Sequence, residues 1–238
     1  PYADSVVDWS PVGEQGVNNW YYGYYNLTAD ADGVFEQDDF IEFDPNEHWR
    51  GNMFRLAPSN CPWTLLQQEG THPNGVNSCP NEEHWSIRRW VSDLAEGVNI
   101  TWHTRETNLN GAGVSGMLYL NGELLDSEVI AGGDGVGVTR TIAMEVFEGD
   151  VIDLALSPTG PNEDTHDGSD GSANWLRISQ DLEWVGGPDE VCGNGEDDDG
   201  DGLVDCDDSD CAAEEACQVV KGPVFHRGDP DDNGAIQL

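Results

Sequence analysis

The sequence predicts an all-β protein, a jelly-roll β-sandwich followed by a small disulfide-rich module at the C-terminus. Three observations favour this fold class. Short stretches rich in β-branched and aromatic residues recur along the first three quarters of the chain, bounded by Gly, Pro, Asn and Asp. No amphipathic helical pattern of any length competes with them. Further along, four cysteines lie among closely spaced acidic residues.

The predicted strands all lie in the first part of the chain. Ten or more short strands without intervening helices imply two antiparallel sheets packed face to face. We expect strands over Ser5–Ser10, Asn19–Tyr25, Phe40–Asp44, Asn52–Ala57, Trp63–Gln67, His84–Val91, Val98–Glu106, Val114–Leu120, Val138–Phe147, Asp150–Ser157 and Trp175–Trp184.

Two turns between these strands have clear sequence signals. Asn121-Gly122 separates two apolar stretches, and this dipeptide is preferred in tight hairpins because both central residues reach positive φ. Glu148-Gly149-Asp150 follows a stretch of strictly alternating residues and precedes the next apolar run. Both patterns predict a short turn between consecutive strands.

The charge balance excludes several classes of partner. The 238 residues include 47 acidic and nine basic side chains, which gives a formal net charge of −38. Nucleic acid and anionic membrane surfaces bind clustered positive charge, so neither suits this chain. No apolar run approaches the roughly 18 residues of a membrane-spanning helix, so we expect no membrane insertion. Cations are the partners that this charge favours.

Charge also marks the expected domain boundaries. Residues 189–217 contain thirteen acidic residues and no basic ones, and Gly186-Gly187-Pro188 before them has the composition of a hinge. We therefore expect a jelly-roll domain at 1–186, a cysteine-rich acidic module at 187–217 and a C-terminal segment at 218–238. Because the sequence starts with Pro1 rather than methionine, we expect a processed or excerpted piece of a longer protein.

The acidic module has the spacing of a calcium loop. Carboxylates occupy positions one, three, five and twelve, and glycine occupies position six, as Ca²⁺ requires from a short stretch of backbone. The predicted ligands are Asp197, Asp199, Asp201, Asp205 and Asp208. The alternative is a solvated acidic linker, but the regular spacing and the four cysteines favour calcium. The pattern resembles the calcium repeats of thrombospondin type 3, which implies the same cofactor, Ca²⁺.

A second loop of this kind begins near the end of the sequence. Its predicted calcium ligands are Asp229, Asp231 and Asn233, and the sequence stops before a twelfth position. The residues around its start, Phe225–Pro230, resemble the opening of a dockerin-type calcium repeat. Two explanations remain open, truncation of a longer protein or completion of the site by another segment.

The cysteines indicate an oxidising compartment. Their number, six, is even, and acidic calcium loops need the millimolar calcium found outside cells, so we expect an extracellular protein. Cys61 and Cys79 flank a loop rich in Pro and Asn and are expected to pair with each other. The other four are expected to form two bridges of open connectivity: Cys192, Cys206, Cys211 and Cys217. Zinc is disfavoured because no C-x₂-C spacing occurs.

Three motifs in the first domain resemble a jelly-roll module of large secreted bacterial proteins. They are Gln15–Tyr24, Trp85-x-x-Arg88-Arg89-Trp90 and Gly149-Asp150-x-Ile152-Asp153. Such modules are similar in layout to carbohydrate-binding modules, so the resemblance implies a jelly-roll fold, and it identifies no ligand. In so acidic a domain, we expect most arginines of the second motif to pair with neighbouring carboxylates.

One aromatic row provides a candidate ligand-binding platform. Trp20, Tyr22 and Tyr24 alternate along a predicted strand and share one face, whereas Tyr21 and Tyr25 share the other. An exposed row would stack on the apolar faces of sugars. The alternative is that both rows pack, one into the core and one beneath a loop.

The function predicted from these features is non-catalytic. No nucleophile elbow, metalloprotease motif, phosphate loop or dinucleotide fingerprint occurs, and 47 carboxylates identify no single glycosidase pair. The acidic loop Asn162–Asp170 offers either a further calcium or polar-ligand contact or a solvated loop. We expect a calcium-binding extracellular module that binds a glycan or surface within a larger secreted protein. The alternatives are a structural subunit whose copies assemble into a calcium-stabilised fibre or layer, and a polysaccharide-degrading enzyme.

Overall fold

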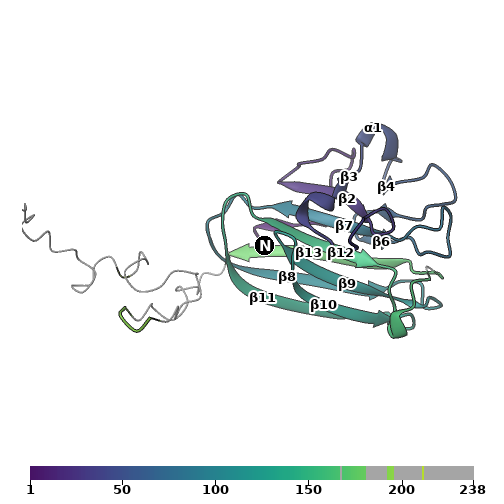
Figure 1. Ribbon diagram of the computed structural model, residues 1–238. Coiled ribbons are helices and arrows are strands. Elements are labelled where there is room, and N and C mark those ends of the chain that lie inside the picture. The colour runs from purple at the N-terminus through teal and green to yellow at the C-terminus, as the bar shows by residue number, and fades with distance from the viewer. Residues whose placement is uncertain (167, 181–191, 196–210, 212–238) are drawn as a thin grey trace, which may run out of the picture. The chain divides into compact units, whose positions relative to one another are not determined.

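The computed structural model describes residues 1–166, 168–180, 192–195 and 211. The chain divides into two units, Pro1–Leu182 and Glu183–Leu238. All described helices and strands lie in the first unit, which is drawn as a β-rich ribbon in Figure 1. In the described part of the chain, no helix is long and apolar enough to cross a membrane. The division into segments at 186 and 217 stays a prediction.

Antiparallel strands form two sheets that pack face to face, as the sequence predicts (Figure 1). Sheet A has seven strands in the order β11-β8-β13-β6-β5-β4, with β1 also paired to β13. Sheet B has six strands in the order β10-β9-β12-β7-β2-β3. The strands are β1 (Ala3–Asp4), β2 (Trp20–Asn26), β3 (Ile41–Glu42), β4 (Phe54–Arg55), β5 (Leu65–Leu66), β6 (Gly70–His72), β7 (His84–Val91), β8 (Glu96–Glu106), β9 (Gly113–Leu120), β10 (Glu123–Ala131), β11 (Val138–Val146), β12 (Val151–Ser157) and β13 (Ser172–Gln180).

The strand order confirms the jelly roll. When the eight strands from β6 to β13 are numbered one to eight, sheet A contains strands one, eight, three and six side by side, which are β6, β13, β8 and β11. Sheet B contains strands two, seven, four and five side by side, which are β7, β12, β9 and β10. This is the winding of two Greek keys that defines a jelly roll. The N-terminal strands β1 to β5 extend both sheets beyond this eight-stranded unit.

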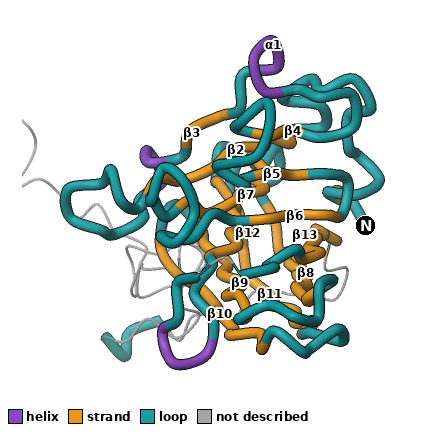
Figure 2. The backbone as a smooth tube through the Cα atoms, turned by 90° about the vertical axis from the view of Figure 1, so that its right-hand side faces the viewer, coloured by secondary structure: helices purple, strands orange, loops and turns teal. Residues whose placement is uncertain are grey.

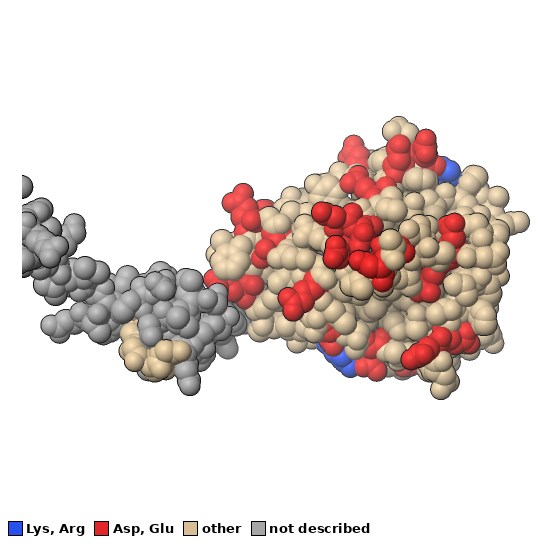
Figure 3. Space-filling model, in the orientation of Figure 1, with Lys and Arg blue, Asp and Glu red and all other residues tan. Residues whose placement is uncertain are grey.

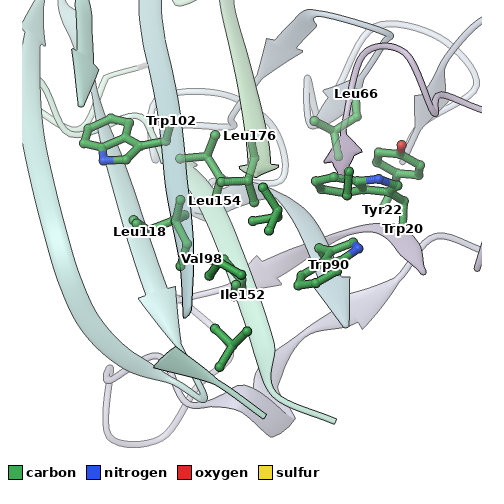
Figure 4. Close-up of a cluster of buried hydrophobic side chains, with 14 of the residues drawn as sticks. Trp20, Tyr22, Leu66, Trp90, Val98, Trp102, Leu118, Ile152, Leu154 and Leu176 are labelled. Atoms are coloured by element: carbon green, nitrogen blue, oxygen red, sulfur yellow. The ribbon is translucent and has the colours of Figure 1, made fainter. Parts of the chain in front are cut away.

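The hydrophobic core lies between the two sheets. Along β8, the inward residues Val98, Ile100 and Trp102 are fully buried, and the residues between them are partly exposed. This two-residue period follows from the pleat of a strand. Figure 4 shows Trp102 at one end of the core, and Trp20 and Trp90 at the other. Strands from both sheets contribute to this one cluster.

The predicted strand over Ser5–Ser10 is wrong. Only Ala3–Asp4 pairs there, as β1, and the chain then turns. The Asp4 carboxylate accepts hydrogen bonds from the backbone N–H groups of Val6 and Val7, at 2.9 and 3.2 Å. Such side-chain acceptors give the backbone a local alternative to sheet pairing.

Other predicted strands are present in the structure but differ from the prediction in length. Strands β3, β4 and β5 are two residues each, shorter than their predicted stretches. After β3, Asp44 accepts the Asn46 N–H at 2.8 Å and starts the short helix α1 (Pro45–His48). Two 3₁₀ turns, η1 (Gln37–Asp39) and η2 (Pro161–Glu163), complete the helical elements described, and all three lie at the periphery (Figure 2). The last strand reaches Gln180, and residues 181–184 lie outside the described part.

Both predicted turns are confirmed. Asn121 and Gly122 have φ values of 51° and 85° and connect β9 to β10 as a tight hairpin. Gly149 has φ 96° in the turn between β11 and β12. Strand β10 extends for nine residues beyond the hairpin, further than the apolar stretch that follows Gly122 in the sequence indicates.

The two arginines of β7 are satisfied in different ways. Arg89 forms a two-bond ion pair with the buried carboxylate of Asp153, with both N–O distances 2.8 Å, as the sequence predicts. Arg88 is fully buried and donates instead to neutral oxygens, Asn174 Oδ1 at 2.7 Å and the Gln67 carbonyl at 2.8 Å. Burial lowers the pKa of Arg88 to about 10, which still leaves it charged at neutral pH.

Candidate functional site

The aromatic row of β2 is not a binding platform. Trp20 and Tyr22 are 0 % and 1 % exposed and belong to the core, where Figure 4 shows them together. Tyr24 packs partly buried against the same cluster, with its ring stacked on Phe43 at a centroid distance of 5.4 Å. The prediction of these three as ligand-binding residues is therefore corrected. Aligned against β7 in the middle of a closed sandwich, this row faces the opposite sheet rather than solvent.

The other face of β2 also packs. Tyr25 is buried in a second cluster with Phe35 and Trp85, and its hydroxyl donates to Asp30 at 2.6 Å. The structure therefore agrees with the alternative interpretation of the sequence, in which both aromatic rows contribute to packing.

The predicted calcium ligands lie outside the described residues. This applies to Asp197, Asp199, Asp201, Asp205, Asp208, Asp229, Asp231 and Asn233, as well as to Cys206 and Cys217. Within the described part of the chain, no group of three or more His, Cys, Asp or Glu side chains is arranged to hold a metal ion. Calcium binding by these loops stays a prediction.

Two disulfides are present among the described cysteines. Cys61 pairs with Cys79, as predicted, across a Cα–Cα distance of 5.7 Å. Cys192 pairs with Cys211, which also gives a Cα–Cα distance of 5.7 Å and decides one of the bridges that the sequence left open. Disulfides of this kind are typical of proteins that fold in an oxidising compartment.

A group of side chains that the sequence analysis did not select lies on the outer face of sheet A. We call it the sheet-face patch. Its members come from three neighbouring strands, alternate with core residues and are partly or fully exposed: Thr101, His103, Arg105, Thr139, Thr141, Trp175 and Arg177. The strand pairing places β8 between β11 and β13, so all seven residues belong to one continuous surface.

Trp175 is the centre of this patch. It lies directly opposite His103 in the register of β13 and β8, and the two rings stack at a centroid distance of 5.2 Å and an angle of 18°. The Arg177 guanidinium lies 4.0 Å from the Trp175 ring centroid. Such cation–π contacts hold a guanidinium and an aromatic ring in a fixed relation. The indole is therefore oriented by two neighbours before any ligand arrives.

Hydrogen bonds hold the surrounding polar groups. His103 Nδ1 and Thr139 Oγ1 are 2.9 Å apart, and Arg177 Nε donates to Asp4 at 2.7 Å. Desolvation lowers the pKa of His103, a hydrogen bond with the Val138 backbone opposes this in part, and the ring is neutral at pH 7. The patch thus combines an aromatic face with neutral and cationic donors.

A cleft of about 360 Å³ adjoins the patch at Arg105. Its polar lining comes from Gln67, Glu69 and His72 on the β5–β6 side and from Thr107 on the β8 side. Aromatic stacking surface beside a cleft lined with amide, carboxylate and imidazole groups is the usual composition of a site for a polar organic ligand.

The charge of the patch contrasts with the rest of the sandwich. Figure 3 shows carboxylates in several groups on the visible face, with basic side chains only at its margins. Against nine basic residues in the whole chain, the patch contains two arginines on adjacent strands. One of them, Arg177, forms an ion pair with the buried carboxylate of Asp4, with an N–O distance of 2.7 Å.

Comparisons with known proteins give weak structural likenesses. No protein-family model and no curated protein sequence matches the chain. A β-glucosidase from Kluyveromyces marxianus aligns at 10% identity and a TM-score of 0.32, over 69% of this chain and 17% of that one. A family 35 carbohydrate-binding module from Clostridium thermocellum aligns at 12% identity and TM-score 0.28, over 41% of this chain and 72% of that one. The CBM51 of Clostridium perfringens GH95, solved with methyl-galactose, aligns at 11% identity and TM-score 0.29, over 49% and 75%.

The chain thus spans 17% of the length of the β-glucosidase that it matches. All three TM-scores are below 0.5. Any function assigned to the chain therefore depends on its own residues.

Proposed function

We propose that this chain is a non-catalytic extracellular module that binds a glycan through the sheet-face patch, with calcium bound by the acidic loops after the sandwich. The observation that carries the proposal is the Trp175 ring, held on an open sheet face by His103 and Arg177. Sugars present apolar C–H faces and equatorial hydroxyls, and these match an aromatic ring flanked by fixed donors.

The neighbouring groups support the same assignment. Arg105 and the side chains of the adjoining cleft extend the site beyond one sugar ring, which suits an oligosaccharide better than a monosaccharide. The disulfides suit an extracellular location. The buried ion pair of Arg89 and Asp153 lies away from solvent, so those groups serve stability rather than hydrolysis.

Replacing Trp175 with Ala is expected to weaken glycan binding at least tenfold, about 1.4 kcal/mol, because the stacking surface and the anchor for Arg177 disappear together. A glycan array followed by calorimetry with the best ligand would measure this. Trp85→Ala is the matched control, since Trp85 is also partly exposed but lies on β7 of the other sheet, where its ring packs on Tyr25 at a centroid distance of 5.0 Å. The proposal fails if both variants bind like the wild type, or if the wild type releases reducing ends from the polysaccharide.

Removing calcium with a chelator is expected to make residues 192–217 more susceptible to protease. Carboxylates about 4 Å apart repel by roughly 1 kcal/mol per pair in water when no cation lies between them. Limited proteolysis with and without Ca²⁺ would show the change, and Asp199→Asn combined with Asp201→Asn should reproduce it in the presence of calcium. Equal cleavage under all conditions would contradict calcium binding by this loop.

A structural subunit is the second candidate, and one observation favours it. Strands β10 and β11 are edge strands of nine residues each, and long edges can pair with another copy. However, β10 carries Glu123, Asp126 and Glu128, and acidic edges oppose such pairing. Sedimentation over a range of protein concentrations, with and without chelator, would detect calcium-dependent assembly.

A further inference from the structure

A second cleft adjoins the turn between β5 and β6. Its volume is about 430 Å³, and Gln67, Glu69 and Gly70 line both this cleft and the one at Arg105. The turn is therefore part of the wall of two neighbouring clefts. We call the second one the Trp9 cleft, after the aromatic ring in its lining. Its other lining residues are Pro11, Gly51, Asn52 and Gln68.

The Trp9 cleft has the chemical composition of a sugar-binding site. The Trp9 ring is partly exposed, and the amide side chains of Asn52 and Gln68 are exposed beside it. Gln68 Nε2 donates to the Val6 carbonyl oxygen at 2.8 Å, which holds this amide in place. An aromatic ring supplies a stacking face, and amides both donate and accept hydrogen bonds, as sugar hydroxyls require.

Buried groups hold the Trp9 ring from the inside of the sandwich. The rings of Tyr22 and Phe54 contact it edge-on, at centroid distances of 4.5 and 6.0 Å. The Arg88 guanidinium lies 5.8 Å from its ring centroid. Tyr22, Phe54 and Arg88 are all 1 % exposed or less, and close-packed side chains of this kind keep their positions. Trp9 is therefore oriented before any ligand binds.

Arg88 also connects the Trp9 cleft to the sheet-face patch. Its Nη2 donates to the carbonyl oxygen of Gln67, in the turn that both clefts share, at 2.8 Å. Its Nε donates to Asn174 Oδ1 at 2.7 Å, and Asn174 immediately precedes Trp175 in β13. One buried cation thus contacts Trp9, the shared turn and the strand that carries Trp175. These contacts fix the spacing of the two aromatic rings.

We propose that the Trp9 cleft is a second sugar-binding subsite, and that one oligosaccharide extends from Trp175 across the β5–β6 turn to Trp9. The inference rests on the proposed function and adds the class of ligand, an extended chain rather than a short terminal sugar. Trp175 lies on β13, and Trp9 packs against Phe54 of β4. These strands are three strand spacings apart in sheet A, about 14 Å, which exceeds the size of one sugar ring.

The test is calorimetry of the full chain with purified oligosaccharides of two to six sugar units, prepared from β-glucan, xylan, mannan and galactan. In the series that binds, the hexasaccharide should bind at least about tenfold more tightly than the disaccharide, because contact with the second subsite is then intramolecular. Trp9→Ala should remove this gain and leave disaccharide binding unchanged. Trp175→Ala should weaken the binding of every length.

The controls separate this subsite from the Trp175 site. Trp85→Ala, on sheet B, should keep the full dependence on chain length. Equal affinity of the wild type for disaccharide and hexasaccharide, or unchanged hexasaccharide binding by Trp9→Ala, overturns the inference and leaves the Trp175 site in place. If Trp9→Ala does not fold, Asn52→Ala combined with Gln68→Ala decides, since both side chains are exposed: a reduced gain with length supports the subsite, and an unchanged gain overturns it. If the wild type binds no oligosaccharide of the four series, the proposed function fails and the inference fails with it.

Discussion

Replacing Arg89 with Ala is expected to lower the free energy of unfolding by about 3–5 kcal/mol at neutral pH. The change leaves the carboxylate of Asp153, which is 0 % exposed, without its ionic partner. It also removes the hydrogen bond from the guanidinium to the Gln37 carbonyl, 2.9 Å long, and the contact with the Phe40 ring at 4.1 Å. Urea unfolding followed by tryptophan fluorescence would measure the loss.

The sign of the pH dependence follows from Asp153. Burial raises the pKa of its carboxyl group, and Arg89 opposes this in part, so removing Arg89 raises that pKa further. A group with a raised pKa in the folded state destabilises it as pH rises through that value. The defect of Arg89→Ala should therefore shrink as the pH falls towards 4. Adding Asp153→Asn should recover about 2 kcal/mol at neutral pH, because the buried charge is then absent.

A matched control uses an arginine with similar partners at the surface. Arg140 pairs with Asp126 and Glu128, but its side chain is 38% exposed. Arg140→Ala should cost about 1 kcal/mol or less. Equal losses in Arg89→Ala and Arg140→Ala would mean that burial of the β7 ion pair contributes nothing.

The sequence predicts the fold better than the site, for a physical reason. Alternation along β8 and the positive-φ dipeptide Asn121-Gly122 are local signals, and local signals determine strands, hairpins and the inward face of each strand. Strand β6 has only three residues, Gly70-Thr71-His72, and no such local signal. It pairs with β5 and β13 because those strands are already in place on either side of it. Short strands of this kind are decided by tertiary contacts.

The candidate site depends on register, which one sequence does not reveal. Trp175 and Arg177 are two residues apart and were visible as one face of a strand, as were His103 and Arg105. Only the pairing of β8 with β13 brings these faces together and sets Trp175 opposite His103. By contrast, the row of β2 had the stronger aromatic pattern but lies against the opposite sheet. Aromatic density in a sequence measures the tendency to pack at least as much as the tendency to bind.

Replacing Trp20 with Ala is expected to cost about 3–5 kcal/mol and to lower the Tm by about 10 °C. Its indole is 0 % exposed, packs in the core and donates from Nε1 to Asp8 at 3.2 Å. Trp175→Ala removes a partly exposed ring with one stacked neighbour and one cation–π contact, and should cost about 1 kcal/mol. Differential scanning calorimetry of both variants would give the comparison.

The decisive comparison sets these stability losses against glycan binding. Trp20 packs in the core, so Trp20→Ala should bind glycan normally at any temperature where it remains folded. Trp175 lies at the surface, so Trp175→Ala should be folded and bind glycan at least tenfold more weakly. A platform on β2 requires the reverse pattern, with binding lost in Trp20→Ala well below its Tm. Stability and binding should thus separate between these two tryptophans: Trp20, on the inner face, contributes to folding, and Trp175, on the outer face of sheet A, would contact the ligand.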